Sequence, residues 1–321
     1  MILADSAIGA DPATEIPQFS DFKGSDVAEA LSGKVKTTRG PEMQGPSDLA
    51  VECLYFVPLP VEKTVDLLRR WNGTRHSELK VYLHGSVSGQ PSVNDFKSIA
   101  SAPKNAAVRA FVSAMQGSDP KSPGLQMNQE EAKRAPSGDG SGTLTAEISS
   151  FWSNLLTERA RAFVRSGLAG QPPYARGGET VSVSNEVNRL LQAEPRVRQQ
   201  FARILGAASF NRGGGLKPSL YWTMFDVEDQ AALTLGAEYA QALGDGRWQI
   251  LDLQYYSSGG HFALITFYQL WPAKDGTLVW REDRVSAPAL GELRGVERLG
   301  SSSVMMKKIA KSANYFIQDA K

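Results

Sequence analysis

The stretch of residues 261–271 constrains the fold of this chain most, because it is apolar on both sides of an extended strand. A strand with one solvated face alternates apolar and polar side chains, whereas a strand covered on both faces is apolar throughout. Here one side carries Ala263, Ile265 and Phe267, and the other carries Phe262, Leu264, Tyr268 and Leu270. The stretch therefore predicts a central strand in a sheet that has a covering layer on each face.

Further strands lie next to this central one along the chain. Residues 248–256 precede it and residues 278–285 follow it, and both segments are rich in β-favouring side chains. The intervening residues 257–260 and 273–276 have the length and the glycines of hairpin connections. Two weaker candidate strands lie upstream, at residues 220–227 and 231–236. The pattern predicts an antiparallel meander.

The chain ends in a segment with helical periodicity, residues 302–319. Its apolar residues recur at the spacing of one helix face, while lysines occupy the opposite face. The apolar positions are Met305, Ile309, Ala313 and Phe316. We expect this face to cover one side of the sheet.

The first part of the chain adds fewer elements. Residues 1–33 are polar, and we expect a partly disordered lead-in with one short helix at 25–31. The strongest strand signal before the meander is at residues 48–57, and the two prolines that follow lead into a helix at 61–71. Other strands are expected at residues 34–38 and 78–84.

The middle of the chain is helical and is interrupted by a polar segment. Residues 117–143 are dominated by Gly, Ser, Pro, Asp and Lys, which predicts a flexible loop. Helices are expected at residues 104–115, 144–167, 184–193 and 195–205. We therefore expect one α+β domain over residues 34–321, in which a curved antiparallel sheet packs on the C-terminal helix and residues 144–210 form a helical insertion.

Composition excludes several classes of protein. The 321 residues carry a net charge of +1, without the basic excess typical of nucleic-acid binding. The one cysteine, Cys53, excludes an internal disulfide and a multi-cysteine metal site, and its apolar neighbours indicate a buried, inert thiol. No apolar run approaches the ~20 residues that span a bilayer, which favours a soluble chain.

The N-terminal residues leave the compartment open. They lack a basic segment and include Asp5, so they do not form an intact signal peptide. We expect either an exported chain whose signal peptide has been removed or a cytoplasmic one. Oligomeric state is equally open.

The order of elements resembles the helix-grip fold of the START-like (SRPBCC) superfamily. The resemblance lies in a strand that passes through prolines into a helix, FVPLPVEKTV at residues 56–65, and in the closing TLVWREDRV at residues 277–285 before the last helix. It implies a curved antiparallel sheet that wraps the C-terminal helix and encloses an apolar cavity. The helical segment 100–210 departs from the family and would be an insertion.

No catalytic motif is present at a convincing spacing. The histidines His76, His84 and His261 lack metal-ligand spacing with one another or with a carboxylate. The sequence GSVSG at residues 85–89 resembles a hydrolase elbow but has valine at the nucleophile position. Glu282 and Asp283 are adjacent on a strand and therefore face opposite ways. We expect no catalytic residue, no metal and no cofactor.

Aromatic density in the second half of the chain is the one positive sign of a binding site. Such residues fill a sheet core or line an apolar pocket, and the sequence leaves both interpretations open. If a pocket lies between the sheet and the last helix, it would bind a lipid or another apolar small molecule. The candidate ligand-binding residues are Trp222, Tyr255, His261, Phe267, Trp280, Arg281, Met305 and Ile309.

Two other functions remain open. The helices of residues 144–205 would serve as a protein-interaction surface if they exposed a contiguous apolar patch. An enzyme would use His261 as acid and base, and would need a carboxylate within hydrogen-bond reach of its ring.

Overall fold

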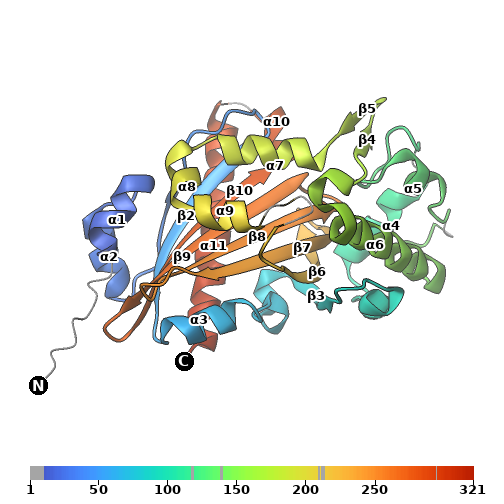
Figure 1. Cartoon of the computed structure of the whole chain (residues 1–321). Coiled ribbons are helices and arrows are strands. Elements are labelled where there is room, and N and C mark those ends of the chain that lie inside the picture. The colour runs from blue at the N-terminus through green and yellow to red at the C-terminus, as the bar shows by residue number, and fades with distance from the viewer. Residues whose placement is uncertain (1–10, 117–118, 138–139, 209, 211–213, 294) are drawn as a thin grey trace, which may run out of the picture.

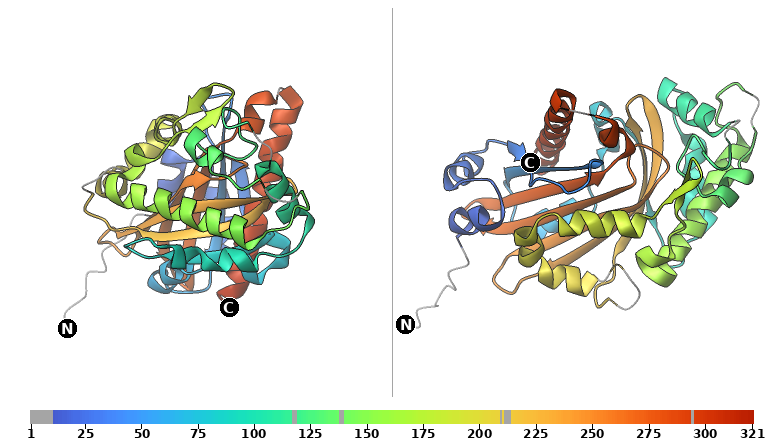
Figure 2. Two further views of the ribbon diagram at one scale, coloured as in Figure 1. Left: turned by 90° about the vertical axis from the view of Figure 1, so that its right-hand side faces the viewer. Right: turned by 90° about the horizontal axis from the view of Figure 1, so that it is seen from above.

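The computed structural model describes residues 11–116, 119–137, 140–208, 210, 214–293 and 295–321. They form one large antiparallel sheet between two layers (Figure 1). The long C-terminal helix lies on one face, and most of the other helices lie on the opposite face, as the view from above shows (Figure 2). The predicted α+β class, with a helical segment in the middle of the chain, is confirmed.

The large sheet has eight strands in the order β1-β2-β10-β9-β8-β7-β6-β3, and all neighbouring pairs are antiparallel. The five consecutive strands from β6 to β10 form the predicted meander. The first long strand, β2, pairs with the last, β10. The strand bounds are β1 Lys36–Arg39, β2 Asp48–Val57, β3 Val81–Val87, β6 Ser219–Val227, β7 Gln230–Ala242, β8 Trp248–Ser257, β9 Ala263–Ala273 and β10 Gly276–Ser286. A separate hairpin joins β4 Tyr174–Arg176 and β5 Glu179–Val181.

Strand β9 is covered on both sides, as its sequence predicts. Ile265 and Phe267 belong to the core on the side of the many helices, and Leu270 belongs to the core on the side of the C-terminal helix. All three are fully buried. The sheet thus separates two cores of unequal size.

Most helices agree with the predicted segments to within three residues. The last helix, α11, begins seven residues before its predicted start, and the segment predicted as one helix at 195–205 forms two, α8 and α9. The three short helices α1, α5 and α10 and the 3-10 helices were not predicted. The α-helices are α1 Pro12–Phe19, α2 Gly24–Leu31, α3 Val61–Leu68, α4 Ala106–Met115, α5 Gln129–Lys133, α6 Ala146–Ser166, α7 Val183–Gln192, α8 Pro195–Gln200, α9 Ala202–Ala208, α10 Pro288–Glu292 and α11 Gly295–Asp319. The 3-10 helices are η1 Gly73–Arg75, η2 Ser77–Leu79, η3 Val93–Ser101 and η4 Gly167–Gly170. None of the described helices is long and apolar enough to cross a membrane.

Part of the segment predicted as a flexible loop, residues 117–143, is packed instead. It contains α5, whose N-terminus has a capping box between Asn128 and Glu131. The side chain of Glu131 is buried and accepts two hydrogen bonds from Arg159 of α6, at 2.9 and 2.6 Å. Because a buried arginine requires a partnered anion, this pair fixes α5 against the long helix. Residues 117–118 and 138–139 lie outside the described part.

The helix α11 contacts the sheet over β2 and β1. Ile309, Ala313 and Phe316 are buried there, and the ring of Phe316 meets Tyr55 of β2 edge-on at 6.4 Å. The helix begins at Gly295, earlier than predicted, because the run of serines and glycine at residues 300–303 weakens its helical signal.

We expect Ile309→Ala to lower the free energy of unfolding by about 3 kcal/mol, because it removes buried methyl groups and leaves a cavity. Val304, on the same helix, is 54% exposed, so Val304→Ala should change it by less than about 0.5 kcal/mol. Urea denaturation followed by circular dichroism measures both. Equal losses in the two variants would contradict this packing of α11.

Candidate functional site

A pocket of about 920 Å³ lies between the start of α11 and the end of the sheet. Its apolar side is formed by Leu49 of β2, Val285 of β10, Leu290 of α10 and Met305 of α11. Leu290 and Val285 are buried, whereas Leu49 and Met305 are half-buried. The pocket therefore has an apolar floor beneath the first turns of the C-terminal helix.

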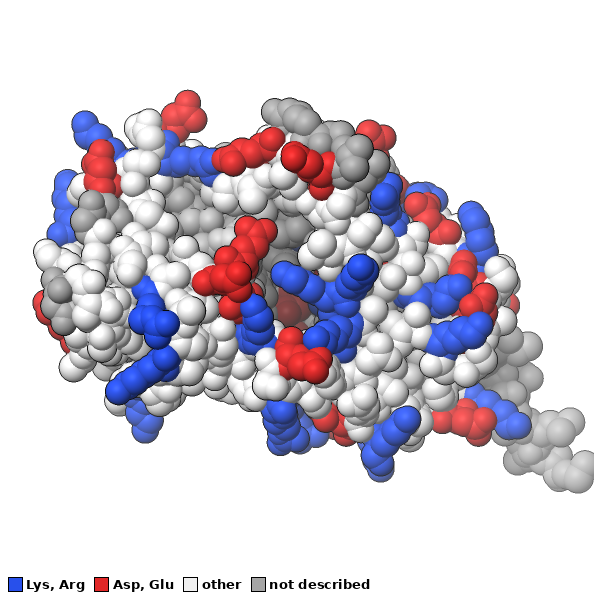
Figure 3. All heavy atoms as spheres, turned by 180° about the vertical axis from the view of Figure 1, so that it is seen from behind, with Lys and Arg blue, Asp and Glu red and all other residues white. Residues whose placement is uncertain are grey.

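The opposite wall of the pocket comes from loops and is more polar. It includes the β6–β7 turn with Glu228, the glycines before Phe262, and the β4 strand with Arg176. The guanidinium of Arg176 lies over the ring of Phe262, 5.4 Å from its centre. Lys308 of α11 lies on the helix side. Seen from behind, the surface is hollowed, and acidic and basic side chains surround the hollow (Figure 3).

Next to the pocket, a row of polar side chains crosses the middle of the α11 face of the sheet. Strand register places Asp283, Thr266, Asp252 and Glu238 directly opposite one another on four consecutive strands, from β10 to β7. Opposite residues of antiparallel strands have their Cβ atoms about 5 Å apart. Central sheet positions are normally apolar, so four polar residues in one row require a particular explanation.

The Asp283 end of this polar row is neutralised. The carboxylate of Asp283 accepts hydrogen bonds from Arg281 Nε at 2.8 Å and Nη2 at 2.9 Å, and from the Thr266 hydroxyl at 2.6 Å. Arg281 also lies over the Tyr268 ring at 5.4 Å. The Arg281 side chain is 19% exposed, whereas Asp283 and Thr266 are buried, so solvent reaches the guanidinium and not the carboxylate.

Asp252 is held by a tyrosine that reaches across a neighbouring strand. Tyr221 Oη donates to the Asp252 carboxylate, at 2.8 and 2.9 Å from its two oxygens. The ring passes over Gly236 of β7, where a β-carbon would lie 2.1 Å from Tyr221 Cζ. Only glycine admits the ring at this position. On its other side the ring stacks on His84 at 5.7 Å.

The electrostatics of the polar row follow from partial burial. Burial raises the pKa of Asp252 to about 6. Burial and repulsion from Asp252 raise the pKa of Glu238 to about 7, although Arg69 Nε lies 3.2 Å from that carboxylate. Burial lowers the pKa of His84. The row therefore contains two carboxylates that protonate near neutral pH.

A second buried polar group lies on the other face and is sealed. Glu52 and Glu282 are paired across β2 and β10, with 1% and 0% exposure. Burial and the neighbouring Glu282 raise the pKa of Glu52 to about 8, and Arg284 forms an ion pair with Glu282. As expected, Glu282 and Asp283 face opposite sides. Because solvent does not reach these two carboxylates, they affect the stability of the fold and are not accessible to a ligand.

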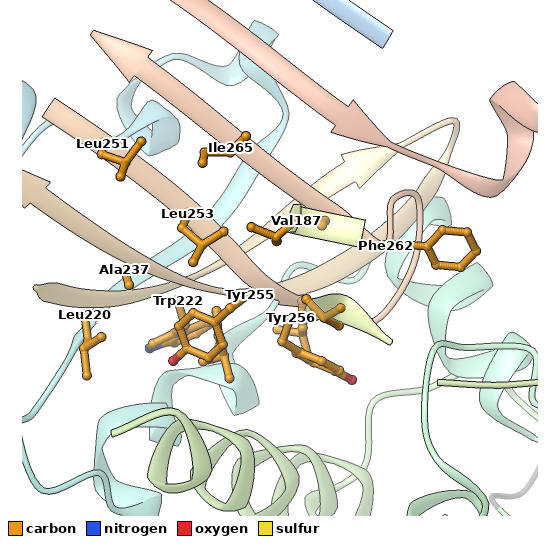
Figure 4. Packing of buried hydrophobic residues seen from close by; sticks show 14 of the residues in the cluster. Val187, Leu220, Trp222, Ala237, Leu251, Leu253, Tyr255, Tyr256, Phe262 and Ile265 are labelled. Carbon is orange, nitrogen blue, oxygen red and sulfur yellow. The ribbon is translucent and has the colours of Figure 1, made fainter. Parts of the chain in front are cut away.

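The eight sequence-predicted ligand residues lie on both faces of the sheet. Four of them belong to the large core under the helices, so they do not line the α11 side. Tyr255 stacks on Phe163 of α6 with centroids 3.9 Å apart. Figure 4 shows Trp222 and Tyr255 on the side of the covering helices. The four are Trp222, Tyr255, Phe267 and Trp280, each fully buried.

Three of the predicted residues lie on the α11 face. Met305 lines the pocket, Arg281 belongs to the polar row, and Ile309 is packed against the sheet. The four residues of the large core fit the alternative interpretation, in which the aromatic side chains fill the core of the sheet, because they contact the covering helices. A ligand role for the three remains a prediction.

His261 lies at the edge of the pocket, between Gly260 and Phe262, which both line it. The ring is 6% exposed and lies near Phe225, with 6.3 Å between the centroids. Burial lowers its pKa to about 4, so it is neutral at physiological pH. Among the described residues, none forms a hydrogen bond with His261 Nε2. The carboxylate that acid–base catalysis by His261 would require is therefore not found among them.

Sequence reasoning missed Asp252, Glu238 and Tyr221 as site residues. One signal was present, since Asp252 interrupts the otherwise apolar residues 250–253 of a strand. A carboxylate at such a position needs a hydrogen-bonding partner or solvent. The partner, Tyr221, is far away in sequence and only strand register brings it near.

The only cysteine behaves as predicted. Cys53 is fully buried on β2, and burial raises the pKa of its thiol to about 12. No group of three or more His, Cys, Asp or Glu side chains within the described ranges is arranged to hold a metal ion.

Comparisons with known proteins add little. No protein-family model matches the chain, and no curated protein is significantly similar to it. Among solved structures, the crystal structure of Ara h 8.0201 is 10% identical and aligns over 34% of this chain and 71% of its own, with a TM-score of 0.21. A TM-score at this level does not establish a shared fold.

We expect the stability of the protein to fall as pH rises from about 4 to about 7. The folded-state pKa of Asp252 lies above its value of 3.8 in an unfolded chain, so its contribution is complete below pH 3.8 and is lost as pH rises through about 6. Asp252→Asn removes this titration and should flatten the decline by about 2 kcal/mol.

Urea denaturation at a series of pH values measures this effect. The matched control is Asp275→Asn in the exposed β9–β10 turn, which should leave the pH profile unchanged. If stability declines with pH equally steeply in both variants and in the unmodified protein, the decline does not come from the titration of Asp252.

Proposed function

We propose that this protein binds a lipid or another amphipathic small molecule, without chemical change, in the pocket between α11, α10 and the end of the sheet. The observation that carries the proposal is the pocket of about 920 Å³ with an apolar floor. Pockets for small organic ligands are commonly about 300–1,000 Å³ and are mostly apolar, with a few polar groups that orient the ligand.

The polar residues of the wall are suited to such a ligand. Arg176, Glu228 and Lys308 lie at the pocket, while Leu49, Val285 and Met305 form its floor. An apolar tail gains about 25 cal/mol for each Å² that the floor removes from water. Charged groups at the rim would keep a polar end near solvent.

The order of the elements supports this assignment. A strand, a helix, an edge strand, an antiparallel meander and a last helix follow one another, as in the helix-grip arrangement that the sequence resembles. In that arrangement the ligand lies between the sheet and the last helix. We propose that residues 34–321 are one domain, in which the insertion of about 144–210 covers the other face and leaves this one for the ligand.

The interaction-surface alternative is less well supported. The apolar stripe of α6 includes Trp152, Leu155 and Phe163, and all three are buried within the large core. One large apolar side chain of α6, that of Val164, is exposed, at 48%. An isolated exposed valine is ordinary on a protein surface.

The proposal predicts that the purified protein takes up a neutral apolar fluorophore such as N-phenyl-1-naphthylamine, and that a chain alcohol such as dodecanol displaces it. Met305→Trp, which fills the pocket, should weaken dodecanol binding about tenfold, equivalent to about 1.4 kcal/mol. Met306→Trp is the matched control, because Met306 is also half-buried on α11 but does not line the pocket.

Native mass spectrometry provides an independent readout, because an amphipathic molecule bound during expression would add mass that is lost on denaturation. Lack of fluorophore uptake, together with a ligand-free native mass, would refute the proposed function. Equal weakening in the two tryptophan variants would move the binding site away from this pocket.

A further inference from the structure

Of the carboxylates in the polar row, Asp252 is the one without a cationic partner among the described residues. Asp283 is bonded by Arg281, and Glu238 forms an ion pair with Arg69 at 3.2 Å. Asp252 accepts hydrogen bonds from the neutral hydroxyl of Tyr221. A carboxylate withdrawn from water without a countercharge is energetically costly, so a missing cation is a feature to explain.

The groups that face Asp252 do not supply this cation. The field of Arg281 reaches Asp252, but the guanidinium is engaged in a two-point contact with Asp283. The ring of His84, stacked on Tyr221, is held neutral by burial. On the helix side, Lys311 is paired with Glu78 at 2.6 Å and Lys308 is exposed.

Asp252 also keeps contact with solvent, on the sheet face that carries the pocket floor. It keeps a solvent-accessible surface in the middle of β8, as do Gln254 and Tyr221 next to it. Val285, on the pocket floor, is two residues from Asp283 on the same face of β10. Since alternate residues on one strand face are about 7 Å apart, the polar row begins one step beyond the apolar floor.

Resting on the proposed function, we infer that the ligand class is an amphipathic amine, whose ammonium group binds Asp252 while its apolar tail occupies the pocket. An ammonium group supplies the missing countercharge and donates charge-assisted hydrogen bonds. A carboxylate ligand would instead meet the excess negative charge of Asp252.

The test uses three ligands with the same twelve-carbon tail, namely dodecylamine, dodecanol and dodecanoate. The affinity of each ligand is measured by displacement of N-phenyl-1-naphthylamine from the full-length protein at pH 7.5, below the concentration at which the ligand aggregates. We expect dodecylamine to bind about tenfold more tightly than dodecanol, and dodecanoate to bind more weakly than both. Equal affinities, or a preference for dodecanoate, would overturn the inference.

Two variants locate the effect. Asp252→Asn should reduce the preference for dodecylamine over dodecanol to less than about twofold, because the neutral amide supplies no countercharge for the ammonium group. Tyr221→Phe removes the hydroxyl but keeps the carboxylate, so the preference should persist. A preference that survives Asp252→Asn would place the ammonium group elsewhere and overturn the assignment.

The two proposals fail in different ways. If no member of the series displaces the fluorophore and Met305→Trp has no effect, the proposed function itself fails. If dodecanol binds in a Met305-dependent manner and dodecylamine has no advantage, the pocket function stands and the amine assignment alone fails. The comparison of the three ligands on the unmodified protein needs no variant, so a misfolded Asp252→Asn protein would not prevent the test.

Discussion

Burial of β9 on both faces is the constraint on which the rest of the structure depends. Ile265 and Phe267 on one side and Leu270 on the other leave neither face of the central strand suited to water. The sheet therefore requires two covering layers. The chain supplies them from different places, with α11 from its end and the helical segment, together with α1 and α2, from its middle and beginning.

The two layers cover their faces unequally, and the candidate site is a consequence. On the side of the many helices, aromatic side chains such as Trp222 and Tyr255 are packed against η3 and α6. On the other side, α11 lies over β1 and β2 and α3 contacts β9 and β10, and these two helices do not cover all eight strands. The uncovered part of the face has the apolar pocket at one end and the polar row beside it. Arg281 and Arg69 pair with Asp283 and Glu238, whereas Asp252 has the Tyr221 hydroxyl as its partner.

The unequal burial also separates two sets of carboxylates. Glu52 and Glu282 are enclosed, and burial raises the pKa of each. Asp252 keeps contact with solvent and has a pKa near 6. Solvent does not reach the enclosed pair, whereas it reaches Asp252. Residues of the same chemical type thus have different possible roles because of the layer that lies over them.

The sequence by itself determined the meander, the doubly buried central strand and the apolar face of the last helix, because these depend on the local spacing of side chains. It also indicated that Glu282 and Asp283 point to opposite faces. The tertiary structure alone decided which face each aromatic residue joined, and that Tyr221 crosses Gly236 to reach Asp252. Period-2 alternation assigns side chains to two faces but does not say what will cover each face. That choice depends on contacts between segments far apart in the chain, which local patterns do not encode.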